Sequence, residues 1–322
     1  MKIIFVCVGN FQEYILDNIK NLKLFQNNDI VVITEPHFFQ YFEDDKTTVL
    51  VDCHALEDYG FNQNSRLDKN FRNGFWHLCS LRFFYLYSYI HTNHLTDCIH
   101  LENDVMTYIN FDNFGYNLNR QRFEMKQSSI SSSAVTTLKN ENDKLYITYD
   151  RSISSSRVIP GIVYIPNANS LKTVIENYNF GFDDMYNLGK IGGEPLPIFP
   201  IIDENINQLN INYPLFHSIF DAAAMGQYLG GIDKRNQEHP NDDTRGFVNE
   251  TCDIKYNHYL FFWVYKNGEN LYIPHLLVGK DLIQINNLHI HSKELYKFMA
   301  NNPLEEKYIT KIQLDTNVKS VN

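Results

Sequence analysis

Short apolar runs alternate with a helical pattern along the first part of the chain. Residues 2–8 (KIIFVCV), 29–34 (DIVVIT) and 47–52 (TTVLVD) are rich in apolar and β-branched residues, as expected for strands buried on both faces. Between the first two runs, residues 12–25 repeat apolar side chains at intervals of three and four positions, which predicts an amphipathic helix. A strand, a helix and a strand in this order predict a right-handed βαβ unit with parallel strands.

The rest of the chain continues this alternation. Residues 73–90 form the longest helical segment, and a fourth strand follows within residues 97–104 (DCIHLEND). Further strands are predicted over 144–150, 157–167 and 284–293, and further helices over 170–180 and 216–231. We therefore predict an α/β fold with a Rossmann-like, mostly parallel central sheet, helices on both of its faces, and a smaller half abutting it.

The chain shows no internal repeat and no linker that would separate two domains cleanly. Its 322 residues are enough to bury one large core. We predict a single domain over residues 1–322, built from a first half over 1–112 and a second half over 113–322.

Composition and charge exclude several classes of protein. The net charge of −10 and the lack of a basic stripe argue against binding to nucleic acid. The five cysteines are scattered and form no CxxC pair, which excludes a disulfide framework and a zinc site and favours a reducing compartment. No apolar stretch is long enough to cross a bilayer, so we expect a soluble, cytoplasmic protein without a transmembrane segment.

The fourth strand ends in an acidic tripeptide. Glu102, Asn103 and Asp104 follow the apolar residues Ile99 and Leu101 directly. In an open α/β sheet, this carboxyl edge is where ligands bind. Two carboxylates two residues apart point to the same side of an extended chain and suit Mg²⁺ or Mn²⁺, which also takes phosphate oxygens. The alternative is an ordinary acidic turn at the end of a strand.

A second polar group lies late in the chain, within residues 284–293. His289 and His291 alternate with Ile290, so both imidazoles share one face of a strand, and Lys293 follows them. An imidazole can complete the coordination of a cation, and an ammonium group can neutralise a diphosphate. We predict that this segment folds against Asp104, although a solvated surface strand would give the same pattern.

Three further charged residues lie in apolar surroundings. Arg82 stands inside the aromatic helix over 73–90, and it either pairs with a carboxylate or reaches a ligand. Asp184 and Asp221 are flanked by apolar or glycine-rich chain and could serve as a base. Asp221 could equally be the N-cap of a helix.

Taken together, these residues resemble those of the nucleotide-sugar-dependent glycosyltransferases with a GT-A fold. In that class, a DxD-type motif ends the fourth strand and holds a divalent cation against the donor diphosphate. The segment LENDV looks like its ExD-type variant, and HIHSK is similar to the late element that closes the metal and diphosphate site. The order of these elements along the chain also fits.

The resemblance implies a role for each of these residues. Asp104 would be the main ligand of Mn²⁺ or Mg²⁺, with Glu102 a direct or water-mediated one and either His289 or His291 the late one. The residues that would bind the donor are Gly9, Asn10, Glu35, Arg82, Asn103 and Lys293. Asp184 and Asp221 would face the acceptor or C1 of the sugar. Residues 1–112 would form the donor half and residues 113–322 the acceptor half.

The implied reaction moves a sugar from a nucleotide-sugar, with UDP-sugars favoured, to a hydroxyl group of a glycan, a glycoprotein or a small molecule. A metal-dependent nucleotidyltransferase would use a similar acidic site, but the chain has no glycine-rich phosphate loop. A carbohydrate-binding module without catalytic activity is the alternative from a different class.

Overall fold

The computed structural model describes the N-terminal third of the chain almost continuously and the remainder in segments. The described residues are 1–112, 144–149, 158–191, 194–195, 259–266, 269–278, 281–284, 287–290 and 293–301. The predicted helix over 216–231, with Asp221, and the residue His291 lie outside them.

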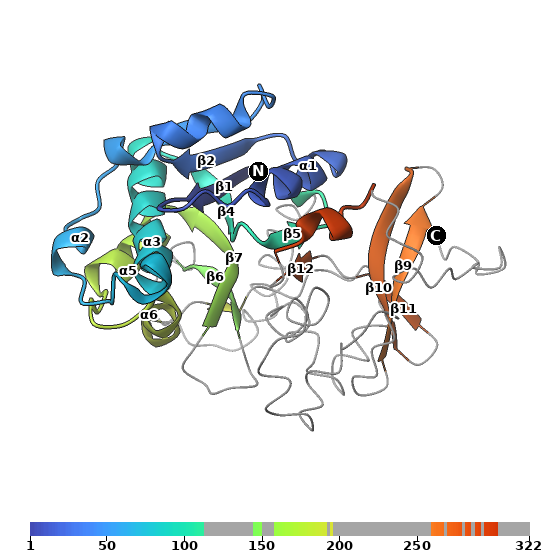
Figure 1. Cartoon of the computed structure of the whole chain (residues 1–322). Helices are drawn as coiled ribbons and strands as arrows, with labels where there is room; N and C mark the ends of the chain where they lie inside the picture. Colours follow the sequence, from blue (N-terminus) through green and yellow to red (C-terminus); the bar gives the residue numbers. More distant parts are fainter. Residues whose placement is uncertain are drawn as a thin grey trace.

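A seven-stranded sheet forms the centre of the molecule (Figure 1). Its strand order is β3 (Val49–Asp52), β2 (Ile30–Thr34), β1 (Lys2–Cys7), β4 (Thr96–Leu101), β7 (Val158–Asn167), β6 (Tyr146–Tyr149) and β8 (Glu194–Pro195). The first four strands run parallel, and β6 and β8 are parallel as well. Strand β7 runs antiparallel to both of its neighbours. The predicted mostly parallel α/β sheet is confirmed, and it takes strands from both sides of residue 112.

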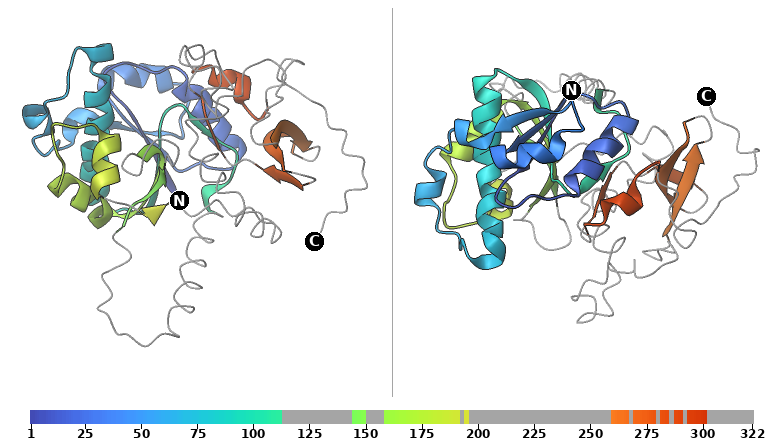
Figure 2. Two further views of the ribbon diagram at one scale, coloured as in Figure 1. Left: turned by 90° about the horizontal axis from the view of Figure 1, so that it is seen from below. Right: turned by 45° about the horizontal axis from the view of Figure 1, so that its top comes forward.

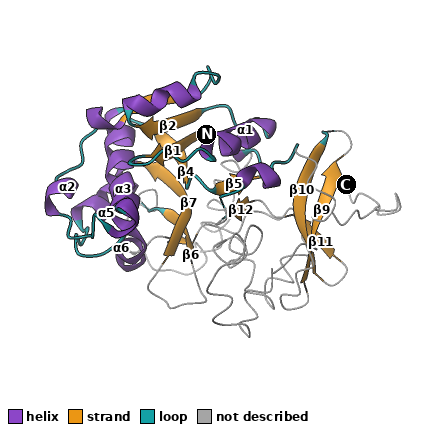
Figure 3. Cartoon of the chain, viewed as in Figure 1, coloured by secondary structure: helices purple, strands orange, loops and turns teal. Residues whose placement is uncertain are grey.

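Helices cover both faces of this sheet (Figure 3). One face packs on α3 (Phe75–Thr92), with α2 (Phe61–Asn64), α5 (Ala168–Glu176) and α6 (Asp184–Ile191) beside it, and the opposite face packs on α1 (Ile15–Leu24). Alternation along β1 separates the two cores: Ile3 and Phe5 face α1, whereas Ile4 and Val6 face α3. Short 3₁₀ helices connect these elements, at Pro36–Phe42, Cys53–Ala55, Phe71–Asn73 and Leu295–Phe298.

Helix α3 is buried along most of its length but also carries polar side chains. Buried Ser80, Arg82 and Ser88 interrupt its apolar residues. Within the described segments, neither this helix nor any other combines the length and the hydrophobicity that crossing a bilayer requires. The helix begins after Gly74, whose φ of 81° is left-handed, so it starts two residues later than predicted.

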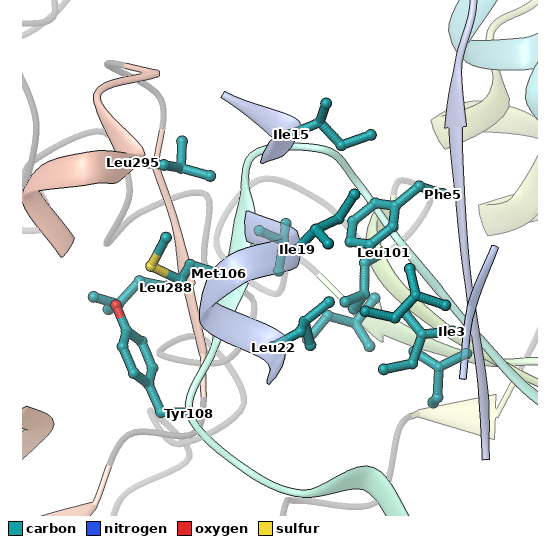
Figure 4. Packing of buried hydrophobic residues seen from close by; sticks show 14 of the residues in the cluster. Ile3, Phe5, Ile15, Ile19, Leu22, Leu101, Met106, Tyr108, Leu288 and Leu295 are labelled. Atoms are coloured by element: carbon teal, nitrogen blue, oxygen red, sulfur yellow. The ribbon is translucent and has the colours of Figure 1, made fainter. Parts of the chain in front are cut away.

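A second layer forms on the outer side of α1. Strand β5 (Val105–Thr107), which continues from the acidic tripeptide, pairs antiparallel with β12 (Asn287–His289). Figure 4 shows Ile19 and Leu22 of α1 between Ile3, Phe5 and Leu101 of the large sheet and Met106 and Leu288 of this pair. Helix α1 is therefore buried on two sides, and the late segment closes the core of the early one.

The C-terminal part adds a three-stranded antiparallel sheet. Its strands, drawn in orange in Figure 2, are β9 (Tyr259–Lys266), β10 (Leu271–Val278) and β11 (Asp281–Gln284). They pair in the order β11-β10-β9. The single strand predicted over 284–293 is wrong. Strand β11 ends at Gln284, β12 covers only Asn287–His289, and the chain turns at Lys293, whose backbone is left-handed with a φ of 65°. Because these residues cross from one sheet to another, one straight strand cannot serve both.

Candidate functional site

The acidic tripeptide forms a tight turn at the carboxyl end of β4. Strand pairing ends where the N–H of Glu102 donates to the carbonyl of Gly161 at 2.9 Å. The N–H of Val105 then donates back to the carbonyl of Glu102 at 3.0 Å, which closes the turn. Buried strands on either side, β4 and β5, therefore fix the three polar residues at the edge of the sheet.

Asn103 faces inward from this turn. Its Nδ2 donates to the carbonyl of Val6 at 3.1 Å and to Oε1 of Gln12 at 2.5 Å. The side chain is buried, and these bonds tie the turn to the end of β1. Its amide nitrogen is bonded to the protein, and the predicted contact of Asn103 with a donor stays a prediction.

Arg82 bridges two carboxylates from different elements. Its Nη1 lies 2.6 Å from Oε1 of Glu102, and its Nη2 lies 2.7 Å from Oδ2 of Asp184 in the first turn of α6. Burial works against the charged guanidinium, but Glu102 and Asp184 outweigh it and raise the pKa of Arg82 above its ordinary value. Of the two roles predicted for Arg82, the structure shows carboxylate pairing.

Asp184 is 1 % exposed, and one of its oxygens is bonded to Arg82. A general base must reach the proton of its substrate. The burial of Asp184 therefore favours a role as the partner of Arg82, and its predicted catalytic role stays a prediction.

Lys293 folds onto Asp104 across 189 residues of sequence. The ammonium Nζ donates to Oδ2 of Asp104, and the N–H of Ile290 donates to the carbonyl of Asp104 at 2.8 Å. Asp104 is buried, whereas the side chain of Lys293 keeps 41 % of its surface exposed. Partial desolvation lowers the pKa of Lys293 to about 8, although the charge of Glu102 opposes this shift. The predicted contact of the late segment with Asp104 is confirmed.

The two late histidines are placed only in part. The backbone of His289 lies in β12 and pairs with Val105, the residue that follows Asp104. His291 lies outside the described residues. Their roles as metal ligands stay predictions.

Three predicted donor-binding residues lie at the same edge, after β1 and β2. The N–H of Gly9 donates to Oε1 of Glu35 at 2.7 Å, which ties the ends of the two strands together. Gly9 has a left-handed φ of 81°, and a Cβ at this position would clash with Leu78. Asn10 and Gly9 are exposed, and Glu35 is half-buried. Because β1 and β2 run parallel to β4 in the same sheet, these residues follow the same carboxyl edge as the acidic turn.

One group of adjacent side chains in the described part of the chain, Asp52, Cys53 and His54, has possible metal-ligating atoms within 4.8 Å of one another. The Oδ1 of Asp52 accepts from the N–H of His54 at 2.9 Å, which is an ordinary cap of a 3₁₀ turn. Burial raises the pKa of the Cys53 thiol to about 12, so it is a poor thiolate ligand. We assign no site to this group.

Sequence reasoning missed Asn18, which contacts the backbone of the acidic turn. Its Nδ2 donates to the carbonyls of Asn103 at 3.1 Å and Val105 at 2.9 Å. The available signal was an asparagine between Ile15, Ile19 and Leu22 on the apolar face of the helix, where a polar side chain needs a hydrogen-bonding partner.

Comparison with known proteins gives only distant likenesses. No protein-family model matches the chain, and no curated protein matches it in sequence. An active-site mutant of LgtC superposes with a TM-score of 0.40 and 13 % identity, over 61 % of this chain and 72 % of that one. GlyE of Streptococcus pneumoniae, a glycosyltransferase, gives 0.35 and 11 %, over 68 % and 51 %. Mouse xyloside xylosyltransferase 1 gives 0.34 and 10 %, over 59 % and 81 %.

Proposed function

We propose that this chain is a glycosyltransferase that moves a sugar from a nucleotide-sugar, with UDP-sugars favoured, to an acceptor hydroxyl. The observation that carries the proposal is the pairing of Lys293 with Asp104 at the carboxyl edge of the parallel strands. That edge is where α/β sheets bind ligands. The resemblance of the motif and its order to those of GT-A glycosyltransferases supplies the reaction class.

Glu102 and Asp104 are suitable ligands for Mn²⁺ or Mg²⁺, because carboxylate oxygens are the ligands these ions prefer. In the described part of the chain, Arg82 pairs with Glu102 and Asp184, and Lys293 pairs with Asp104. A divalent cation at Asp104 would therefore have to replace Lys293. A cation held there would neutralise charge on the diphosphate leaving group.

The chain's own residues would then act as follows. Lys293, which is the most exposed member of the cluster, turns from Asp104 to the donor diphosphate and stabilises the charge that grows as the glycosidic bond breaks. Arg82 stays between Glu102 and Asp184 and keeps the Glu102 carboxylate in place. We assign neither the acceptor nor the catalytic base; Asp184 and Asp221 are the acids predicted on the acceptor side.

The first experiment tests the donor. The purified chain is incubated with Mn²⁺ and a panel of nucleotide-sugars, and release of the nucleoside diphosphate is measured. We expect hydrolysis of a UDP-sugar and stabilisation by UDP with Mn²⁺, by about 2.7 kcal/mol at a hundredfold excess over Kd. GDP, CMP and dTDP serve as controls in the thermal-shift arm. Stabilisation by GDP alone would contradict the choice of UDP, and absence of release from every donor would contradict the reaction.

Lys293→Ala should weaken UDP binding by roughly ten- to a hundredfold, because a charge-assisted contact contributes about 1.5–3 kcal/mol. The same substitution should strengthen Mn²⁺ binding without nucleotide, because Asp104 loses its ammonium partner. Titration calorimetry measures both affinities. Lys172→Ala is the matched control, since Lys172 is exposed on α5 and pairs with Glu176. An unchanged UDP affinity in Lys293→Ala would remove the lysine from the donor site.

A further inference from the structure

Asparagine side chains from α1 and the turn after it line one edge of β5 and its flanking residues. Each side-chain amide donates to a backbone carbonyl: Asn18 to Asn103 and Val105, Asn21 to Thr107 at 2.8 Å, and Asn27 to Ile109 at 2.8 Å. Asn18 and Asn21 are completely buried, and Asn27 is almost so. Buried asparagine side chains are uncommon and need partners, and these three find theirs in backbone carbonyls of β5 and its flanking residues.

The register explains why these carbonyls need partners. Successive carbonyls of an extended strand point to opposite edges. On one edge β5 pairs with β12, with Met106 opposite Leu288, and the N–H of Ile290 donates to the carbonyl of Asp104. The carbonyls of residues 103, 105, 107 and 109 therefore point to the other edge, where α1 lies instead of a strand. The asparagine amides take the place of a neighbouring strand's N–H groups.

Asn18 differs from the other two in what it holds. Its Nδ2 donates to the carbonyls on both sides of Asp104, those of residues 103 and 105. The side chain of Asn103 is tied independently to Val6 and Gln12. The backbone of Asp104 is thus held before and after the residue, which restricts the direction of its carboxylate. Asn27 bonds only to residues that follow Asp104 by five or more positions and to Leu22.

We propose that Asn18 is a positioning residue for Asp104: from α1 it fixes the backbone of the acidic turn and so the direction of the carboxylate. The inference rests on the proposed function only insofar as Asp104 serves the donor. If the Asp104 carboxylate were displaced by a fraction of an ångström, the chain would still fold. The carboxylate would then bind its ligand poorly, because catalysis depends on such geometry.

The test compares Asn18→Leu with Asn27→Leu in the full chain. Leucine is similar in size to asparagine, so each variant mainly removes the amide, and both should lower Tm because each leaves buried carbonyls unpaired. We expect kcat for donor hydrolysis to fall about ten- to a hundredfold in Asn18→Leu, with less than about a twofold change in Asn27→Leu. Equal activity losses at equal Tm losses would overturn the proposal, because they would show a purely structural role.

Hydrogen exchange keeps the test independent of the proposed reaction. In Asn18→Leu we expect faster exchange at Val105, whose N–H closes the acidic turn, and in Asn27→Leu at Phe111, whose N–H donates to Asn27. This crossed pattern would support positioning even if the wild type hydrolyses no donor. The absence of hydrolysis would contradict the proposed function alone.

Uniform acceleration of exchange in both variants would overturn positioning. Should Asn18→Leu not fold, Asn18→Ser retains one donor and should show an intermediate loss, whereas full protection at Val105 would overturn the proposal.

Discussion

Asp104→Asn is expected to lower donor turnover by about 10²- to 10³-fold or more, while the chain stays folded. The backbone on both sides of Asp104 is held by hydrogen bonds from Asn18, so the substituted side chain will extend from the same backbone position. Removing one preorganised charge from a catalytic site costs about this much. The fold should be nearly unaffected, because the partner Lys293 is 41 % exposed and can turn into water.

The matched control for Asp104→Asn is Asp29→Asn. Asp29 pairs with Lys2 and immediately precedes β2, at the opposite end of the parallel strands from the acidic turn. The same chemical change there should leave turnover as it is in the wild type. Activity is measured as nucleoside diphosphate release with Mn²⁺, and folding by thermal melting without metal. Full turnover in Asp104→Asn would place the site elsewhere.

The parallel part of the fold could be predicted from the sequence because its strands are buried on both faces. Such strands appear as continuous apolar runs, and the predicted 2–8 and 29–34 differ from β1 and β2 by one residue each. The direction of β7 could not be predicted. A strand that is buried on both faces has the same apolar pattern whether it runs parallel or antiparallel to its neighbours.

The candidate site was predictable where a charge interrupts apolar sequence. Glu102 and Asp104 follow a buried strand, and Arg82 lies in an aromatic helix, so each needed a partner. Which partner it would be was not predictable, because the pair of Arg82 with Asp184 spans 102 residues and has no local signature. Asn18 was missed for a related reason: its partners are backbone carbonyls, which every sequence supplies.

The buried bridge at Arg82 leads to the largest expected effect on stability. Arg82→Met should lower the free energy of unfolding by about 3–5 kcal/mol, because it leaves the carboxylates of Glu102 and Asp184 without their guanidinium. Methionine is chosen because it is unbranched and can fill much of the space of the arginine stem. Urea unfolding at neutral pH measures the change, with Arg66→Met as a control at an exposed position, where a shift within about 0.5 kcal/mol is expected.

A double variant separates the lost ion pair from lost packing. Asp184 is 1 % exposed, so Arg82→Met leaves the carboxylate of Asp184 without its guanidinium partner and away from water. Arg82→Met combined with Asp184→Leu removes that buried charge as well. Because replacing both members of a buried pair by apolar residues is often nearly neutral, the double variant should recover a large part of the lost stability. Glu102, whose side chain is 18 % exposed, keeps some access to water, so its own cost should be smaller. If the double variant is less stable than Arg82→Met, packing around the arginine stem, rather than its charge, holds α3 and α6 together.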